Sequence, residues 1–162
     1  MKKLIIFILL LSMCTLAHSQ TIKRWKMDDL LSYIEKSDSA LIINFWATFC
    51  GPCVEEIPYF QTITAKYKEQ KVKLLLVSLD FKEYFPQKIA AFAKRFGFTA
   101  EIVWLDEEKP DEFCPKIDEK WSGAMPATLF VNKASAQRFF IEAQLKPEEL
   151  DKAIKKLIVP DK

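Results

Sequence analysis

A chain of 162 residues is long enough for one well-buried domain and short for two. Half of its residues are hydrophobic, and 24 lysines and arginines nearly balance 22 aspartates and glutamates. This balance argues against a nucleic acid partner, because proteins that bind nucleic acids present a surplus of positive charge.

The first 19 residues have the pattern of a secretory signal peptide. Two lysines precede an apolar run over residues 4–11, and the small residues Ala17 and Ser19 predict cleavage before Gln20. A retained membrane-spanning helix would need about 20 apolar residues, and this run is shorter. We therefore expect residues 1–19 to be a signal peptide and residues 20–162 to form one mature domain.

Lipidation at Cys14 is an alternative to simple cleavage, although Met13 is bulkier than the residue expected before a lipidated cysteine. In both cases the protein is expected to be exported and periplasmic. Loss of Lys2 and Lys3 would leave 22 basic and 22 acidic residues, so the mature domain would be formally neutral. We expect it to be a monomer.

Beyond the signal peptide, strand and helix patterns alternate, which is typical of an α/β layer structure. The expected strands cover residues 40–47, 72–79, 101–105, 127–131 and 138–143, the last two as an antiparallel pair. The expected helices cover residues 26–36, a segment that follows Cys50, residues 86–98 and residues 146–158. No repeat or linker divides the chain, so one domain is expected.

The mature domain would contain no histidine, because the only one, His18, lies in the signal peptide. This excludes catalysis by Ser-His or Cys-His pairs and metal sites with histidine ligands. Three cysteines would remain, and disulfides form readily in an oxidising compartment. Cys114 is the odd one, and we interpret it as a free, partly buried cysteine, with a regulatory thiol as the alternative.

The other two cysteines, Cys50 and Cys53, stand where a strand gives way to a helix, with Gly51 and Pro52 between them. Cys50 is expected at the N-cap, where the free amides of the first turn and the helix dipole stabilise a thiolate and lower the thiol pKa. Cys53, one turn further on, is expected to point inward and to attack the mixed disulfide that Cys50 forms. The pair can therefore cycle between dithiol and disulfide.

Three other uses of the cysteine pair are less well supported. A closed zinc site needs four ligands, and only Cys114 could join the pair. A copper site would likewise have no histidine ligand, although thiolates alone can hold Cu(I). A purely structural disulfide that closes so small a loop would gain little chain entropy. Redox chemistry without metal or other cofactor is therefore the favoured interpretation.

The segment "FWATFCGPC" resembles the active-site segment of the thioredoxin fold, and "NFWATFCGPCVEEIP" is similar to exported TlpA-like thiol-disulfide oxidoreductases. In that family a glutamate and a proline follow the second cysteine, here Glu56 and Pro58. "GAMPATLFV" is similar to the loop that carries the family's cis-proline, here Pro126. The resemblance implies an α/β thioredoxin fold, in which helices flank a central mixed β-sheet that carries a helix-strand insertion.

The resemblance also suggests roles for other residues. Asn44 replaces the buried aspartate of cytoplasmic thioredoxins, which makes Glu56 the candidate carboxylate for handling protons. The alternative is that Glu56 only complements the helix dipole. Phe49 stands where the TlpA-like family usually has tryptophan.

A cis Met125-Pro126 bond would leave the backbone of Met125 free to pair with an extended substrate. An apolar rim around this substrate-binding site is expected from Trp46, Phe49, Pro52 and Met125, and core packing is the alternative for Trp46.

The uncharged Gly-Pro pair between the cysteines favours a disulfide reductase, because a histidine there would stabilise the thiolate and favour oxidation. By resemblance, its electron donor would be a membrane thiol-disulfide transporter. Its substrates would be exported proteins with cysteine pairs, for example in cytochrome c maturation. A thiol peroxidase and a non-catalytic thiol-dependent chaperone or binding module are the alternative functions.

Overall fold

The computed structural model describes residues 21–159, so the predicted signal peptide and lipidation site lie outside the described residues. One six-stranded sheet has the order β1-β4-β3-β2-β5-β6. Its strands are β1 (Lys23–Trp25), β2 (Ala40–Trp46), β3 (Val72–Ser78), β4 (Glu101–Leu105), β5 (Ala127–Asn132) and β6 (Gln137–Ile141). The first four strands in the chain run parallel, and β5 and β6 are each antiparallel to their neighbour. The predicted mixed sheet is confirmed.

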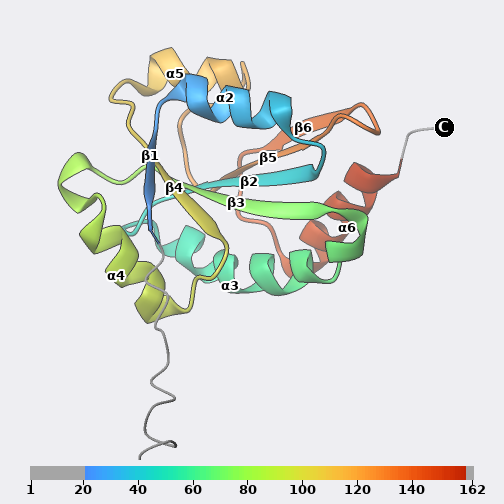
Figure 1. The fold of residues 1–162 in the computed structure, drawn as a ribbon, viewed down its shortest axis with the longest axis horizontal. Helices are drawn as coiled ribbons and strands as arrows, with labels where there is room; N and C mark the ends of the chain where they lie inside the picture. The colour runs from blue at the N-terminus through green and yellow to red at the C-terminus, as the bar shows by residue number, and fades with distance from the viewer. Residues whose placement is uncertain (1–20, 160–162) are drawn as a thin grey trace, which may run out of the picture.

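Helices cover both faces of the sheet (Figure 1). They are α2 (Met27–Lys36), α3 (Gly51–Ala65), α4 (Gln87–Phe96), α5 (Pro110–Ile117) and α6 (Pro147–Ile158), with short 3-10 turns η1 (Lys68–Gln70) and η2 (Lys82–Tyr84). Helices α2 and α5 lie on one face, and α3, α4 and α6 lie on the other. Within residues 21–159 no helix has the length and apolar character needed to cross a bilayer.

The central strand β2 is buried along its whole length, because both of its faces are covered. Leu41, Ile43 and Phe45 point to the α2 and α5 side, while Ile42 and Trp46 point to the α3 and α4 side. This alternation follows from the period of two in a strand. After β2, residues 47–50 lead to the start of α3, where the two cysteines lie.

The predicted alternation of strands and helices is confirmed, and α4 with β4 forms the expected helix-strand insertion between β3 and β5. Strand β1 was not predicted, because its three residues include two exposed basic side chains and show no clear apolar pattern. It is held at the edge by pairing with β4 and by ion pairs from Arg24 and Lys26 to Asp106.

Candidate active site

Cys50 and Cys53 form a disulfide at the start of α3, with a Cα–Cα distance of 5.3 Å. Cys50 is the N-cap of the helix and Cys53 its third residue, as the sequence indicates. Cys50 is half-buried, whereas Cys53 is fully buried. Within the described residues Cys50 is therefore the more exposed of the two cysteines, an arrangement that suits an attacking outer thiol and a resolving inner one.

Glu56 lies one turn beyond Cys53 on α3 and is fully buried. Its carboxylate accepts hydrogen bonds from the Asn44 side-chain amide at 2.7 Å and the Leu145 backbone amide at 3.0 Å. Burial nevertheless dominates over these two bonds and raises the pKa of Glu56 to about 7. A carboxyl group with this pKa can take up and release a proton near neutral pH.

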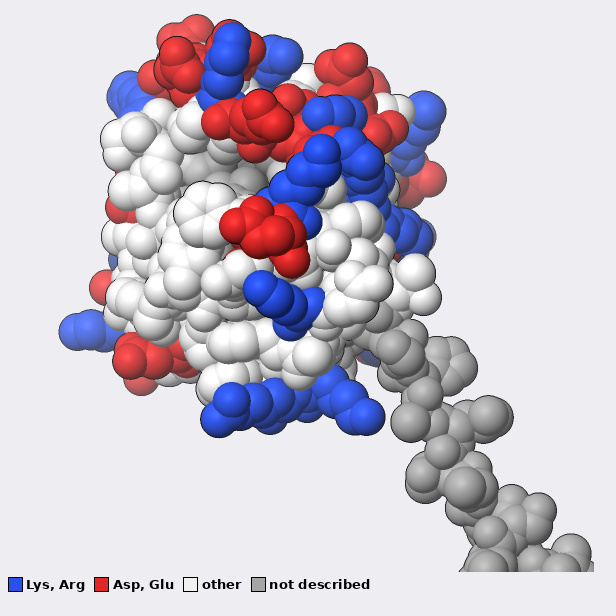
Figure 2. All heavy atoms as spheres, turned by 90° about the vertical axis from the view of Figure 1, so that its left-hand side faces the viewer, with Lys and Arg blue, Asp and Glu red and all other residues white. Residues whose placement is uncertain are grey.

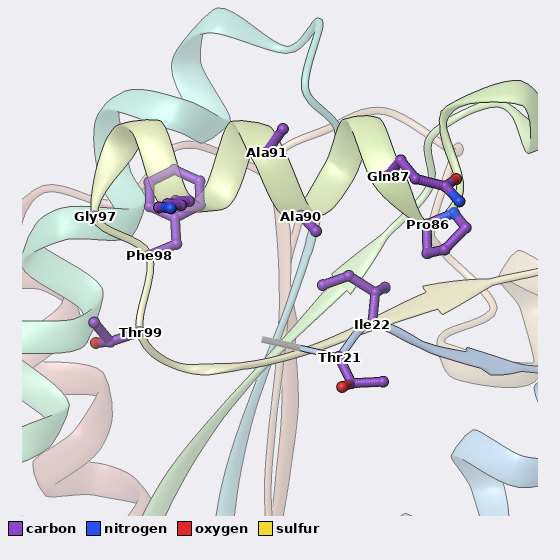
Figure 3. Close-up of a pocket in the computed structure, with 10 residues that line it drawn as sticks. Thr21, Ile22, Pro86, Gln87, Ala90, Ala91, Gly97, Phe98 and Thr99 are labelled. Atoms are coloured by element: carbon purple, nitrogen blue, oxygen red, sulfur yellow. The ribbon is translucent and has the colours of Figure 1, made fainter. Parts of the chain in front are cut away.

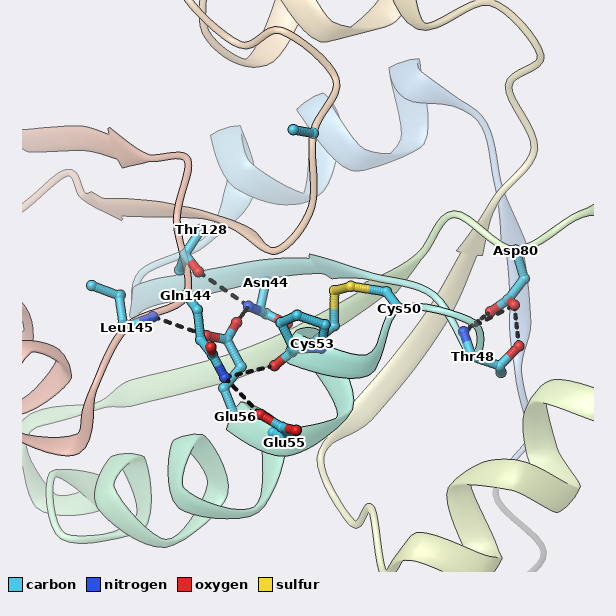
Figure 4. Close-up of a disulfide and its surroundings, with 12 residues drawn as sticks. Asn44, Thr48, Cys50, Cys53, Glu55, Glu56, Asp80, Thr128, Gln144 and Leu145 are labelled. Carbon is cyan, nitrogen blue, oxygen red and sulfur yellow. Dashed lines mark hydrogen bonds between the residues drawn. A yellow bond between two sulfur atoms is a disulfide. The ribbon is translucent and has the colours of Figure 1, made fainter.

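Asn44 links this carboxylate to the sheet, because its amide nitrogen also donates to the Thr128 hydroxyl at 3.1 Å. Asn44 on β2 and Thr128 on β5 are opposite each other in the antiparallel pair. The side-chain oxygen of Asn44 is buried without a hydrogen-bond partner in the described part of the chain. These residues form the Glu56 cluster, which consists of Glu56, Asn44, Thr128 and Leu145. Figure 4 shows this cluster beside Cys53, with Leu145 on the side away from the disulfide.

A second carboxylate, Asp80, lies on the other side of the disulfide (Figure 4) and is 4% exposed. It accepts hydrogen bonds from the Thr48 backbone amide at 3.0 Å, the Thr48 hydroxyl at 2.5 Å and the Ser78 hydroxyl at 2.8 Å. These bonds tie the loop before Cys50 to the end of β3. Asp80 is not among the predicted site residues, although an acid soon after a buried strand is visible in the sequence.

The Met125-Pro126 bond is cis, as the family resemblance implied. Pro126 is buried and Met125 is half-buried against the core around Cys53. No hydrogen bond within residues 21–159 engages the backbone of Met125. Its amide and carbonyl are therefore free to pair with an extended peptide, the role that the sequence analysis gave to this loop.

The predicted apolar rim needs one correction. Trp46 is fully buried and packs against Phe92 and Phe98, because its position on β2 points toward α4. It is therefore core, not rim. Phe49, by contrast, is 54% exposed, and Pro52 is also exposed.

Phe49 has an unpredicted neighbour, Phe81, which is 59% exposed and stacks on it at 5.2 Å between ring centroids. Phe81 belongs to the connection between β3 and α4, so its proximity depends on the fold. The face that carries this connection and α4 has a broad area with few charged side chains (Figure 2). The exposed aromatic pair adds apolar surface next to Cys50.

A hollow lies between α4 and the residues directly before β1 (Figure 3). It is lined largely by apolar groups, among them Ile22, Pro86, Ala90 and Phe98. None of its lining residues is a predicted site residue. The candidate active site is therefore the exposed surface around Cys50 and not this hollow.

Cys114 lies in α5, is 2% exposed and forms no disulfide. Burial raises its thiol pKa to about 11, which disfavours the reactive thiolate. This supports the interpretation of Cys114 as a free cysteine over a regulatory thiol, and Cys114 is more deeply buried than expected. Within residues 21–159 no group of three or more His, Cys, Asp or Glu side chains is arranged to hold a metal ion, and the absence of a cofactor stays a prediction.

Several proteins named thiol-disulfide oxidoreductase ResA are similar in sequence. The protein from Geobacillus kaustophilus is 28% identical over 117 residues, which are 72% of this chain and 62% of that protein. The protein from Bacillus cereus is 40% identical over 94 residues, which are 57% of this chain and 49% of that protein. The chain therefore spans only about half to three fifths of the length of these curated relatives.

Solved structures confirm the thioredoxin-like fold. A thioredoxin-related protein from Neisseria meningitidis serogroup B superposes with a TM-score of 0.64 at 22% identity, covering 76% of this chain and 89% of that one. StoA from Bacillus subtilis gives a TM-score of 0.57 at 22% identity, covering 75% and 86%. The sequence model of the AhpC/TSA family matches residues 15–136, most of the chain. This chain therefore belongs to the AhpC/TSA family.

Proposed function

We propose that this protein is an exported thiol-disulfide oxidoreductase that reduces disulfides in exported proteins. The observation that carries the proposal is the Cys50–Cys53 disulfide at the opening of α3, with Cys50 the more exposed cysteine and Cys53 buried one turn from Glu56. The names of the sequence relatives support the same chemistry. Export is supported by the signal-peptide pattern of residues 1–19.

The reaction starts from the dithiol form. The Cys50 thiolate attacks one sulfur of the client disulfide, so a bond forms between Cys50 and the client, the client disulfide breaks, and one client thiolate leaves and is protonated. Cys53 then loses its proton and attacks the Cys50 sulfur. This step closes the Cys50–Cys53 disulfide and releases the second client thiol. The client gains two electrons, and the protein loses two.

Glu56 is the candidate acceptor of the Cys53 proton. Both side chains are buried on the same side of α3, one turn apart, where water has little access. A thiolate cannot form in such surroundings without a nearby proton acceptor, because burial disfavours the charged form. A carboxyl group with a pKa of about 7 can accept that proton and return it when the disulfide is reduced again.

The reducing direction rests on Gly51 and Pro52, which bring no positive charge to the Cys50 thiolate. Thioredoxin-like and DsbA-like proteins differ by roughly 150 mV, or about 7 kcal/mol for two electrons, and loss of an imidazole partner can supply a large part of this difference. A membrane thiol-disulfide transporter is the proposed electron donor. Exported proteins with cysteine pairs, including apocytochromes c, are the proposed clients.

Insulin reduction with a dithiol donor tests the proposal. The wild-type protein should accelerate the reduction of insulin, and the Cys50→Ser variant should not, because the attacking sulfur is lost. Cys114→Ala, a change at a buried cysteine outside the pair, should retain activity. Turnover by Cys50→Ser would contradict the proposal.

Two further outcomes would favour the alternative functions. Peroxide consumption that depends on Cys50 and needs no disulfide client, with an added dithiol supplying the two electrons per peroxide, would favour a thiol peroxidase. Binding of unfolded clients without any turnover would favour a chaperone.

Trapping in the periplasm with Cys53→Ser should leave the physiological client bonded to Cys50, because the resolving thiol is absent.

A further inference from the structure

The connection between β6 and α6 contacts three separate parts of the candidate site. Glu142, which directly follows β6, hydrogen-bonds the loop that leads to Met125-Pro126. Gln144 hydrogen-bonds the first turns of α3, and Leu145 hydrogen-bonds Glu56. Three residues of one short connection thus contact the loop before the cis Met125-Pro126 bond (the cis-proline loop), helix α3 and the buried carboxylate of Glu56.

Glu142 makes the densest of these contacts. One of its carboxylate oxygens accepts hydrogen bonds from the Ser122 backbone amide at 3.1 Å, the Ala124 backbone amide at 3.0 Å and the Ser122 hydroxyl. The bond from the Ser122 hydroxyl is the main cause that lowers the pKa of Glu142 below its ordinary value. Charge-assisted hydrogen bonds of this kind are about twice as strong as neutral ones.

The loop is held from its other side by Trp121, whose indole nitrogen donates to the Ala124 carbonyl at 3.0 Å. Ala124 is therefore fixed through both its amide and its carbonyl, by Glu142 and Trp121 respectively. The next residue is Met125, whose backbone has no hydrogen bond within residues 21–159. The structure thus immobilises the residue directly before the one that is free to pair with a peptide.

On the other side of the connection, the Gln144 side-chain amide donates to the Pro52 carbonyl at 3.1 Å and to the Glu55 carboxylate at 3.3 Å. The Leu145 carbonyl accepts from the Tyr59 hydroxyl at 2.5 Å. Figure 4 shows Gln144 and Leu145 packed beside Glu56. The connection that carries Glu142 is therefore itself anchored to α3. Because Cys50 is the N-cap of α3, the cis-proline loop is positioned relative to Cys50.

We propose that Glu142 is a positioning residue that fixes the cis-proline loop for extended polypeptides, so that the protein favours disulfides carried by polypeptide segments over small-molecule disulfides. The inference rests on the proposed function. A polypeptide client can form hydrogen bonds with the backbone of Met125. These bonds favour binding most when the loop is already ordered, because the entropy lost in ordering a loose loop opposes association. A small disulfide needs only the sulfur of Cys50.

The test compares two substrates for the reduced protein, insulin and glutathione disulfide. Glu142→Ala should lower kcat/KM for insulin about tenfold, mainly through a higher KM, since loop order is lost. The rate with glutathione disulfide should change less than about twofold, and the redox potential should not move. Glu119→Ala, at an exposed glutamate in the connection that leads to the same loop, should match wild type on both substrates.

Glu142→Gln separates geometry from charge, because its amide oxygen can still accept from the Ser122 and Ala124 amides. It should recover most of the lost insulin activity. Ser122→Ala removes one hydroxyl donor and leaves both amides, so it should show the same selective loss at smaller size. It decides the question if Glu142→Ala does not fold.

Equal losses on insulin and glutathione disulfide in Glu142→Ala and Ser122→Ala would overturn the inference, and so would no loss on either substrate. Failure of the proposed function is a different result, because in that case wild type itself does not reduce insulin. Unchanged insulin activity in a folded Glu142→Ala protein, with wild type active, would overturn only the role of Glu142.

Discussion

Two buried carboxylates flank the disulfide, and their surroundings differ. Asp80 accepts hydrogen bonds from three donor groups, the amide and hydroxyl of Thr48 and the hydroxyl of Ser78, and so holds the loop before Cys50 against the sheet. Within residues 21–159 Glu56 accepts two hydrogen bonds, and burial raises its pKa to about 7. Two acids at similar depth thus have different parts: one anchors the backbone, and the other can carry a proton.

The largest expected effect concerns the pH dependence of stability. Because the folded-state pKa of Glu56 is raised from 4.5 to about 7, its contribution to stability is fully present below pH 4.5 and is lost as pH rises through 7. The loss should be about 3 kcal/mol at pH 8. Urea unfolding of the oxidised protein at several pH values should show this loss in wild type.

Glu56→Gln is the matched control for that measurement, because it keeps the shape of the side chain and removes its ionisation. The free energy of unfolding of this variant should lack the wild-type loss between pH 4.5 and 8. Parallel curves for the two proteins would show that burial does not raise the pKa of Glu56.

The next largest effect tests whether Asp80 anchors the loop before Cys50. Asp80→Ala should lower the free energy of unfolding by about 2 kcal/mol, because the Thr48 amide and Ser78 hydroxyl lose their acceptor. Asp80→Asn keeps one acceptor oxygen and should lose less. Urea unfolding at pH 7 measures both, and an Asp80→Ala loss no larger than that of the exposed Asp38→Ala would contradict the anchoring role.

A smaller effect is expected at the edge of the Glu56 cluster. Thr128→Val keeps the size of the side chain but removes the hydroxyl that accepts from Asn44, so the free energy of unfolding should fall by about 1 kcal/mol. Thr62→Val, at an exposed helical position, is the control. If both variants unfold alike, the Asn44–Thr128 bond does not support the cluster.

Sequence patterns predicted the parts of this molecule that depend on local order. The alternation of apolar segments indicates the sheet and its helices, and the spacing of Cys50 and Cys53 after a strand places one at an N-cap and the other a turn further on. The family resemblance, and not composition, indicated the cis bond at Pro126.

The missed features depend on contacts between distant segments. Asp80 meets Thr48 only because β2 and β3 are parallel neighbours, and Glu142 meets Ser122 across 20 residues of chain. The sequence leaves the rim and the core as alternatives for Trp46. The strand period turns it into the core, where α4 covers it.

The most direct test of the account is the rate at which Cys53 resolves a mixed disulfide on Cys50, measured from pH 5 to 9 in wild type and Glu56→Gln. If Glu56 accepts the Cys53 proton, wild type should show an ionisation near pH 7, and the variant should lack it and react about 100-fold more slowly at neutral pH. Superimposable rate profiles would contradict the account.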